Sequence, residues 1–145
     1  MAVLILAAVC FYGYPLFVAF AGQIFPVPLH QDREEIQTIE LLDATQQEPK
    51  VLLRLEGVEM DGFMDRLLEM KVGRYVNDPP TEHGPLTVKI NYADGAVDYI
   101  GSDICQYITA AGVEESRGWY YTGRRAMKAL FLEYVDAGLL PDLDK

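Results

Sequence analysis

A short group of aromatic and basic residues near the end of the chain is the part of this sequence best suited to recognise a ligand. Trp119, Tyr120 and Tyr121 are followed by Arg124 and Arg125. Aromatic rings beside paired guanidinium groups can recognise carboxylates, phosphates or sugars by stacking and bidentate hydrogen bonds. The arginines also fall at the expected start of a helix, where the helix dipole disfavours positive charge. We therefore predict a binding site for an anion or an acidic partner here. The alternative is that the rings pack in the core and the arginines pair with carboxylates.

Histidines, cysteines and carboxylates offer little basis for catalysis or for metal binding. His30 and His83 have no cysteine at a spacing typical of zinc sites, and no G-x-S-x-G, H-E-x-x-H or glycine-rich phosphate loop occurs. Cys105 falls in a strand pattern, and no third group is placed to orient a pair with His83. The acidic residues do not have the spacing of a calcium loop. The sequence predicts no catalytic residue, no metal site and no cofactor.

The amino-terminal segment has the composition of a membrane span or an export signal. The first 31 residues contain no charged side chain, and all 12 Lys/Arg and all 22 Asp/Glu lie beyond them. Residues 3–21 are almost continuously apolar, and extending the segment to residue 27 gives enough helix to cross a hydrocarbon core of about 30 Å. Residues 1–29 are therefore predicted to be a transmembrane anchor or a signal peptide.

Two fates of this segment stay open. The sequence Ala19-Phe20-Ala21 fits a signal-peptidase site, and cleavage after Ala21 would release a secreted protein. Apolar character continues past that site and no basic residue precedes the segment, which favours retention. A short amino-terminal apolar span usually directs export of the domain on its carboxy-terminal side. We predict a single-pass protein of the cell membrane, held through residues 3–27, with an extracytoplasmic domain over 30–145.

The domain beyond this segment is acidic. All of the net charge of −10 lies beyond residue 31. Nucleic acid and anionic lipid surfaces both need Lys/Arg neutralisation, so the composition disfavours them as partners of the domain. Cys105 is the one cysteine of this part, which excludes an internal disulfide, and we expect it to be a small buried residue.

The spacing of apolar residues predicts the elements that position these groups. Residues 36–41 and Val51–Leu55 are expected to form two strands of a hairpin. Apolar residues between Met60 and Leu68 then recur with helical spacing, which predicts a helix to about Lys71 with Gly73 suited to its carboxy-terminal cap. This helix separates two groups of strands.

The second half repeats the order of strands and then a helix. Alternation over residues 86–92, an Asp94-Gly95 turn and a return strand over 96–100 predict another hairpin, and further strands are expected at 104–108 and around 119–121. Thr122 is positioned to cap a second helix that ends near Gly138. The order predicts an α+β fold in which two amphipathic helices cover one face of an antiparallel sheet.

Several segments together resemble small exported domains. The segments are EIQTIELLD, MDRLLEMKVGRY, LTVKINYADGAVDYIGSDICQYI and GWYYTG. With the amino-terminal span they are similar to membrane-anchored or lipoprotein-type extracytoplasmic domains of uncharacterised Firmicutes families, over most of residues 36–136. The resemblance implies location and architecture, and it brings no catalytic residue with it.

The sequence is compatible with two classes of function. The first is a non-enzymatic, membrane-tethered module that binds a protein, a peptide or an envelope component. The second is an enzyme, or a domain assisting one, that acts on cell-envelope material. The enzyme would need a concave pocket with two or more convergent carboxylates, or His83 in a perturbed environment. A pocket at His83 or Asp103 would favour the enzyme, and a flat aromatic surface near Trp119 would favour binding.

Overall fold

The computed structural model describes residues 25–75, 80–115 and 120–143. It is an α+β fold with antiparallel sheets and two α-helices, as the alternation of strand and helix patterns predicted. Residues 1–24 of the predicted anchor or signal segment (1–29) lie outside the described residues. Of the remainder, Phe25–Pro26 form strand β1 and Val27 is buried in the core of the domain. Within the described ranges, no helix is both long enough and apolar enough to cross a bilayer.

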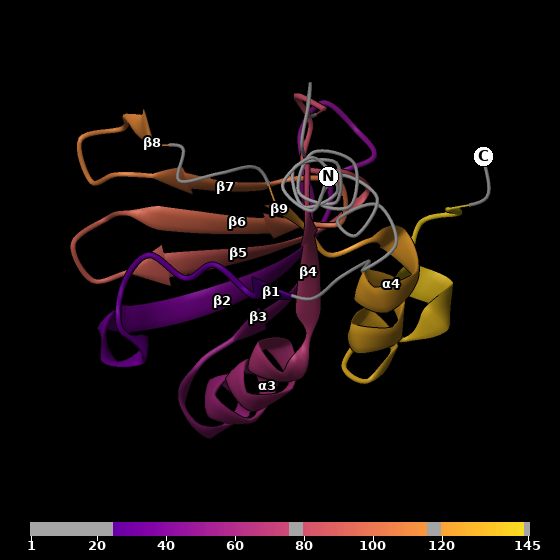
Figure 1. The fold of residues 1–145 in the computed structure, drawn as a ribbon. Coiled ribbons are helices and arrows are strands. Elements are labelled where there is room, and N and C mark those ends of the chain that lie inside the picture. The colour runs from indigo at the N-terminus through magenta and orange to yellow at the C-terminus, as the bar shows by residue number, and fades with distance from the viewer. Residues whose placement is uncertain (1–24, 76–79, 116–119, 144–145) are drawn as a thin grey trace, which may run out of the picture.

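A six-stranded antiparallel sheet forms the centre of the domain (Figure 1). Its strand order is β3-β2-β5-β6-β7-β8. The strands are β2 (Ile36–Asp43), β3 (Lys50–Leu55), β5 (Leu86–Tyr92), β6 (Val97–Gly101), β7 (Cys105–Ile108) and β8 (Glu114–Glu115). The two predicted hairpins are therefore present, and the long pairing between β2 and β5 joins them.

Alternation along β5 divides the sheet into an apolar and a polar face. Leu86, Val88 and Ile90 are fully buried in the core. On the opposite face Lys89 lies beside Glu40 of β2, and its Nζ is 3.0 Å from a Glu40 carboxylate oxygen. Since successive side chains of a strand point to opposite faces, the period of two in the sequence is sufficient to place these residues.

A second, three-stranded sheet was not expected. It has the order β1-β4-β9 and consists of β1 (Phe25–Pro26), β4 (Lys71–Arg74) and β9 (Tyr120–Tyr121). Gly73 was predicted as a helix cap, and that prediction is wrong because Gly73 lies inside β4. A Cβ at Gly73 would overlap the Tyr121 ring, so the glycine permits close packing of β9 against β4.

The two helices are shorter than, or shifted from, their predicted ranges. The first, α3 (Gly57–Glu69), begins three residues before Met60 and passes directly into β4. The second, α4 (Arg124–Leu132), ends well before Gly138, which lies in the 3-10 turn η3 (Ala137–Leu139). The Val135 N–H donates to the carbonyl oxygen of Phe131, and this turn puts Val135 in the core although the residue lies beyond the end of α4.

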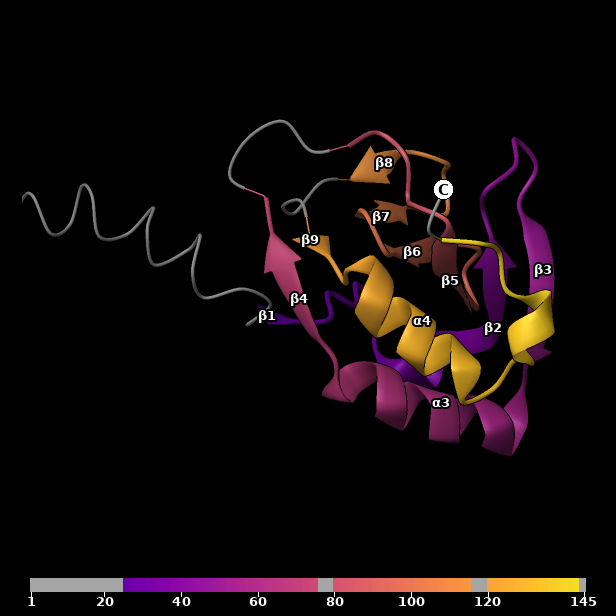
Figure 2. The same cartoon turned by 90° about the vertical axis from the view of Figure 1, so that its right-hand side faces the viewer.

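Both helices contribute to one core. Their buried residues are Phe63, Met64, Leu67, Met127, Leu130 and Phe131. In Figure 2 the helices lie next to each other, and Arg66 of α3 joins them by donating two hydrogen bonds, of 2.9 and 2.6 Å, to the carboxylate of Glu133. A short 3-10 helix, η2 (Arg33–Glu35), precedes β2, and Arg33 pairs with Asp65 of α3.

The start of α4 differs in one detail from the prediction. Gly123, not Thr122, is the N-cap residue. The Thr122 hydroxyl instead donates to the carbonyl oxygen of Gly101 at 3.2 Å, and the N–H of Gly123 donates to Ser102 at 2.9 Å. These bonds anchor the beginning of α4 to the loop between β6 and β7.

Candidate functional site: a cleft at the start of α4

The two tyrosines of the predicted binding group pack against other aromatic rings, whereas Arg124 pairs with a carboxylate. Tyr120 packs edge to face on Phe25, with ring centroids 5.8 Å apart, and Tyr121 lies against Tyr75 at 4.7 Å. Both tyrosines are half-buried in the small sheet. Trp119 lies outside the described residues. The tyrosine rings therefore take part in packing, which was the alternative explanation for them.

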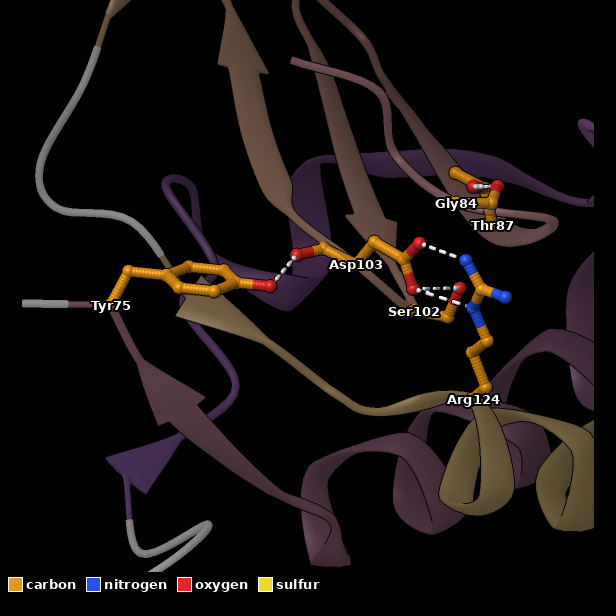
Figure 3. Close-up of polar contacts among 6 residues, drawn as sticks. All are labelled: Tyr75, Gly84, Thr87, Ser102, Asp103 and Arg124. Atoms are coloured by element: carbon orange, nitrogen blue, oxygen red, sulfur yellow. Dashed lines mark hydrogen bonds and ion pairs between the residues drawn. The ribbon is translucent and has the colours of Figure 1, made fainter. Parts of the chain in front are cut away.

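Arg124 makes a two-pronged ion pair with Asp103 (Figure 3). Its Nε donates to Asp103 Oδ1 at 3.1 Å and its Nη2 donates to Oδ2 at 2.8 Å. These hydrogen bonds raise the pKa of Arg124 above its ordinary value. Arg125 is exposed, and none of the carboxylates in the described ranges pairs with it. The two arginines thus differ, because the charge of Arg124 is already balanced by a neighbouring carboxylate.

Asp103 is held by contacts on several sides. Its backbone N–H donates to the carbonyl of His83 at 2.9 Å, and the Tyr75 hydroxyl donates to the Asp103 carbonyl at 2.8 Å. The Ser102 hydroxyl donates to the carboxylate at 3.2 Å. Figure 3 shows Tyr75, which directly follows β4, and Arg124 of α4 on either side of Asp103 in the β6–β7 loop. The Asp103 carboxylate is therefore fixed in position before any ligand arrives.

Gly84 lies directly against Ser102 and Asp103. Its φ of +91° is a conformation that residues with a side chain rarely adopt, and a Cβ there would overlap Ser102 and Asp103. Its carbonyl accepts a hydrogen bond of 3.3 Å from Thr87 (Figure 3). Glycine at this position lets the loop before β5 lie directly against the Asp103 loop.

A cleft of about 340 Å³ opens at this point. Its lining residues come from the β2–β3 turn, the loop before β5, the β6–β7 loop, α4 and the carboxy-terminal segment. They are Ala44, Thr45, Glu82, Gly84, Pro85, Asp103, Arg124, Asp142 and Leu143. The volume is at the lower end of the range typical of small-ligand sites. Three carboxylates line the cleft, although nowhere in the described ranges do three His, Cys, Asp or Glu side chains gather closely enough to hold a metal ion.

His83 lies next to this cleft but points to the polar face of the large sheet. Its ring stacks on Tyr99 with centroids 4.7 Å apart, and its Nε2 lies 2.6 Å from the Gln106 amide oxygen. Burial lowers the pKa of His83 from its ordinary value, against a smaller opposing effect of the Gln106 hydrogen bond. His83 is therefore a half-buried, stacked histidine.

A second polar cluster, around Asp98, was missed in the sequence. Asp98 of β6 is fully buried, and its carboxylate accepts hydrogen bonds from the His30 backbone N–H at 3.0 Å and from the Tyr92 hydroxyl at 2.6 Å. His30 Nδ1 lies 2.6 Å from the other carboxylate oxygen. The His30 ring stacks on Tyr107, with centroids 4.3 Å apart. The sequence does contain one indication of this burial. Asp98 and Ile100 are two positions apart in the same predicted strand, so their side chains point to the same, core-facing side of the sheet.

The Asp98 cluster has the base and the orienting group of a catalytic triad, but the described part of the chain places no nucleophile beside them. Since a carboxylate only accepts hydrogen bonds, His30 presents Nδ1–H to Asp98. Within the described ranges no hydroxyl or thiol donates to His30. Burial raises the pKa of the nearby Cys105 thiol to about 12, so this cysteine is protonated at neutral pH. Burial and the bond to Asp98 also raise the pKa of Tyr92.

Comparison with models of protein families, with curated proteins and with solved structures finds no match to this chain. The similarity to exported Firmicutes domains therefore stays a prediction from residue patterns. The functional argument depends on the site itself.

Proposed function

We propose that this chain is a membrane-tethered extracytoplasmic module that binds a protein, peptide or envelope component and does not catalyse a reaction. A pocket at Asp103 was expected to favour an enzyme, but the observation that carries the proposal is the bidentate Asp103–Arg124 pair, which engages both carboxylate oxygens in that cleft. The charge-free first 31 residues support the tether. The acidic domain would then lie outside the membrane, with the cleft as its contact site.

The state of Asp103 favours recognition over proton transfer. A general acid or base must reach the proton that it moves, within hydrogen-bond distance of the substrate. Both oxygens of Asp103 already accept from Arg124, and one of them also accepts from Ser102. A carboxylate engaged in this way fixes the shape and charge of a binding surface.

The charge of the cleft favours a ligand with a cationic group. Glu82 and Asp103 contribute two negative charges and Arg124 contributes one positive charge, which leaves these three residues with a net charge of −1. Complementary charge increases the rate and specificity of association. A basic segment of an envelope protein or peptide fits the cleft better than the anion suggested by the arginines alone.

Location is tested first, in a Gram-positive host. We expect the full-length chain to remain with membranes after alkaline washing and to lose its domain to protease added outside the cells. A product that begins at Gly22 and is free in the medium would contradict the tether, and a membrane-bound domain shielded from the protease would contradict the topology.

Binding is tested with a photo-crosslinking residue placed at Thr45 in the cleft and, as a control, at the exposed Gln47 of the same turn. We expect a discrete crosslinked partner from position 45 and none from position 47. E82Q, which removes a negative charge from the cleft, should lower the yield several-fold, whereas R125Q, which lies outside the cleft, should not. Equal loss in both variants would contradict a cationic ligand in the cleft.

An enzyme acting on cell-envelope material is the second candidate. It is favoured by one observation: Glu82, Asp103 and Asp142 line a single concave site, and convergent carboxylates are typical of hydrolytic centres. The membrane-embedded chain would be incubated with isolated envelope polymer while released reducing ends and amino groups are measured. Release that is lost in E82Q and kept in R125Q would favour the enzyme over the binding module.

A further inference from the structure

The floor of the cleft crosses the ends of neighbouring strands of the large sheet. The N–H of Ala44, just after β2, donates to the carbonyl oxygen of Pro85, just before β5, at 2.9 Å. Gly84, next to Pro85, lies so close to Asp103 of the β6–β7 loop that a Cβ would overlap it. Asp103 in turn pairs with Arg124. These contacts order the floor from Ala44 at one end to Arg124 at the other.

The two ends of this floor differ in chemistry. Ala44 and Pro85 form an apolar end. At the other end the Asp103 N–H donates to the carbonyl of His83 at 2.9 Å, which puts the neighbouring Glu82 on the Asp103 side. Glu82 is exposed, and none of the basic side chains in the described ranges pairs with it. An ionised carboxylate only accepts hydrogen bonds, and cationic donors make the strongest ones, so a basic group fits this end.

The strand spacing determines the distance between the two ends. β2, β5 and β6 are consecutive in the large sheet. Neighbouring strands lie about 4.8 Å apart, so the floor extends about 10 Å from the end of β2 to the loop after β6. An extended peptide covers about 3.3 to 3.6 Å per residue, so about three residues bridge the floor. Because side chains alternate along such a segment, the first and the third point to the same side.

We infer that the cleft binds an extended peptide segment in which an aliphatic residue and a basic residue are separated by one residue. This inference rests on the proposed binding function. The aliphatic side chain lies on Ala44 and Pro85, and the basic side chain donates to Glu82. The cleft of about 340 Å³ limits the bound part to a few residues. The net charge of −10 favours the approach of a basic segment.

The test uses the full chain in detergent micelles, with the photo-crosslinking residue at Thr45 and short peptides as probes. The probes are acetyl-Leu-Ser-Lys-amide and the reversed acetyl-Lys-Ser-Leu-amide, because the floor does not determine the direction of the segment. Three controls of each probe replace lysine by glutamine, replace leucine by serine, or exchange serine and lysine so that the leucine and the lysine become adjacent. We expect the better probe to give at least fivefold more adduct than each of its controls.

Matched variants test the two ends of the floor. E82Q should bring the adduct yields of the lysine and glutamine peptides to within twofold of each other. E48Q, which removes an exposed carboxylate of the β2–β3 turn outside the cleft, should keep the difference. A44N should reduce the advantage of leucine over serine several-fold, whereas Q47N in the same turn should not. A44N keeps the backbone donor to Pro85, so its effect reports the side chain.

The outcomes separate this inference from the proposed function. A cellular partner captured at position 45, together with equal adducts from all the peptides, overturns this inference and leaves the binding function. Absence of both a captured partner and any peptide adduct overturns the two together. Equal adducts from the peptide without leucine, or from the peptide with adjacent leucine and lysine, overturn the pattern of residues. An equal effect of E82Q and E48Q overturns the role of Glu82.

Discussion

Two aspartates of the β6–β7 region, Asp98 and Asp103, each pair with a basic side chain, and their surroundings give the pairs different roles. Asp98 is 0% exposed and its partner His30 is 9% exposed, whereas Asp103 and Arg124 are 23% and 52% exposed. A buried carboxylate must keep its hydrogen bonds, because an unpaired charge in the core is costly. An exposed pair contributes little to stability. The comparison therefore assigns a stabilising role to Asp98, whereas Asp103 is the carboxylate on which the proposed binding function depends.

The largest expected effect comes from removing each carboxylate in turn. Asp98→Ala leaves the His30 N–H and the Tyr92 hydroxyl without their acceptor in the core. We expect it to lower the free energy of unfolding by about 3 to 5 kcal/mol. Asp103→Ala should cost less than about 1 kcal/mol. Urea unfolding of the full chain in detergent micelles measures both values. Equal costs would remove the distinction between the two pairs.

Two tyrosine hydroxyls sharpen the comparison with smaller changes. Tyr92→Phe deletes the donor to the buried Asp98 carboxylate and should cost about 1.5 to 3 kcal/mol, the range for hydrogen bonds to charged groups. Tyr75→Phe deletes a bond to the Asp103 carbonyl and should cost about 0.5 to 1 kcal/mol. The same unfolding experiment applies. A Tyr75→Phe cost above that of Tyr92→Phe would contradict the assignment.

A glycine substitution tests the wall of the cleft. Gly84→Ala meets both an unfavourable positive φ and overlap with Ser102 and Asp103, and we expect a loss of about 1 to 2 kcal/mol. Gly95→Ala is the control because φ is +90° there and no atom lies within 4 Å of the added Cβ. Gly84→Ala should also reduce partner crosslinking from position 45, which Gly95→Ala should leave intact. Loss of crosslinking in both variants would indicate a general effect.

The smallest effect is a pH dependence at His83. Burial holds its pKa below the ordinary value in the folded domain, so the unfolded chain binds the proton more readily. Stability contributed by the neutral His83 is present above the unfolded pKa of about 6.5 and decreases as the pH falls below it. The slope of unfolding free energy against pH between 7 and 5 should be shallower in His83→Gln. An unchanged slope would place the titrating group elsewhere.

Alternation and turn chemistry were sufficient to predict five strands of the large sheet, but not the two-residue strand β8. The period of two over residues 86–92 and the Asp94-Gly95 turn specify their strands locally, and both are present. The small sheet could not be predicted in this way, because β1 and β9 have two residues each and owe their pairing to β4. From the sequence alone, Gly73 fits a helix cap as well as it fits a strand. The reason for a glycine inside β4 is the Tyr121 ring that packs against it, and this contact depends on the fold.

The candidate site was predicted in part. The sequence placed Arg124 at a helix start and offered pairing with a carboxylate as the alternative to anion binding, and the structure contains that pairing. It could not reveal which carboxylate, because Asp103 and Arg124 meet only through the fold. His30 was placed at the first position of the domain, beside the predicted membrane segment, and its partner Asp98 is 68 positions away. Contacts of that separation leave no local pattern.

The strand order also determines when the domain can become complete during synthesis. The β2–β3 hairpin is local and can form soon after residue 55 leaves the ribosome. The β2–β5 pairing needs residue 92, and the bonds of His30 need Asp98. Closing such long loops is slow compared with forming a hairpin. Throughout that interval the leucines of β2 and β3 are exposed, because the strand that completes their core has not yet paired. Exposed apolar side chains of this kind make a partly folded chain prone to aggregation.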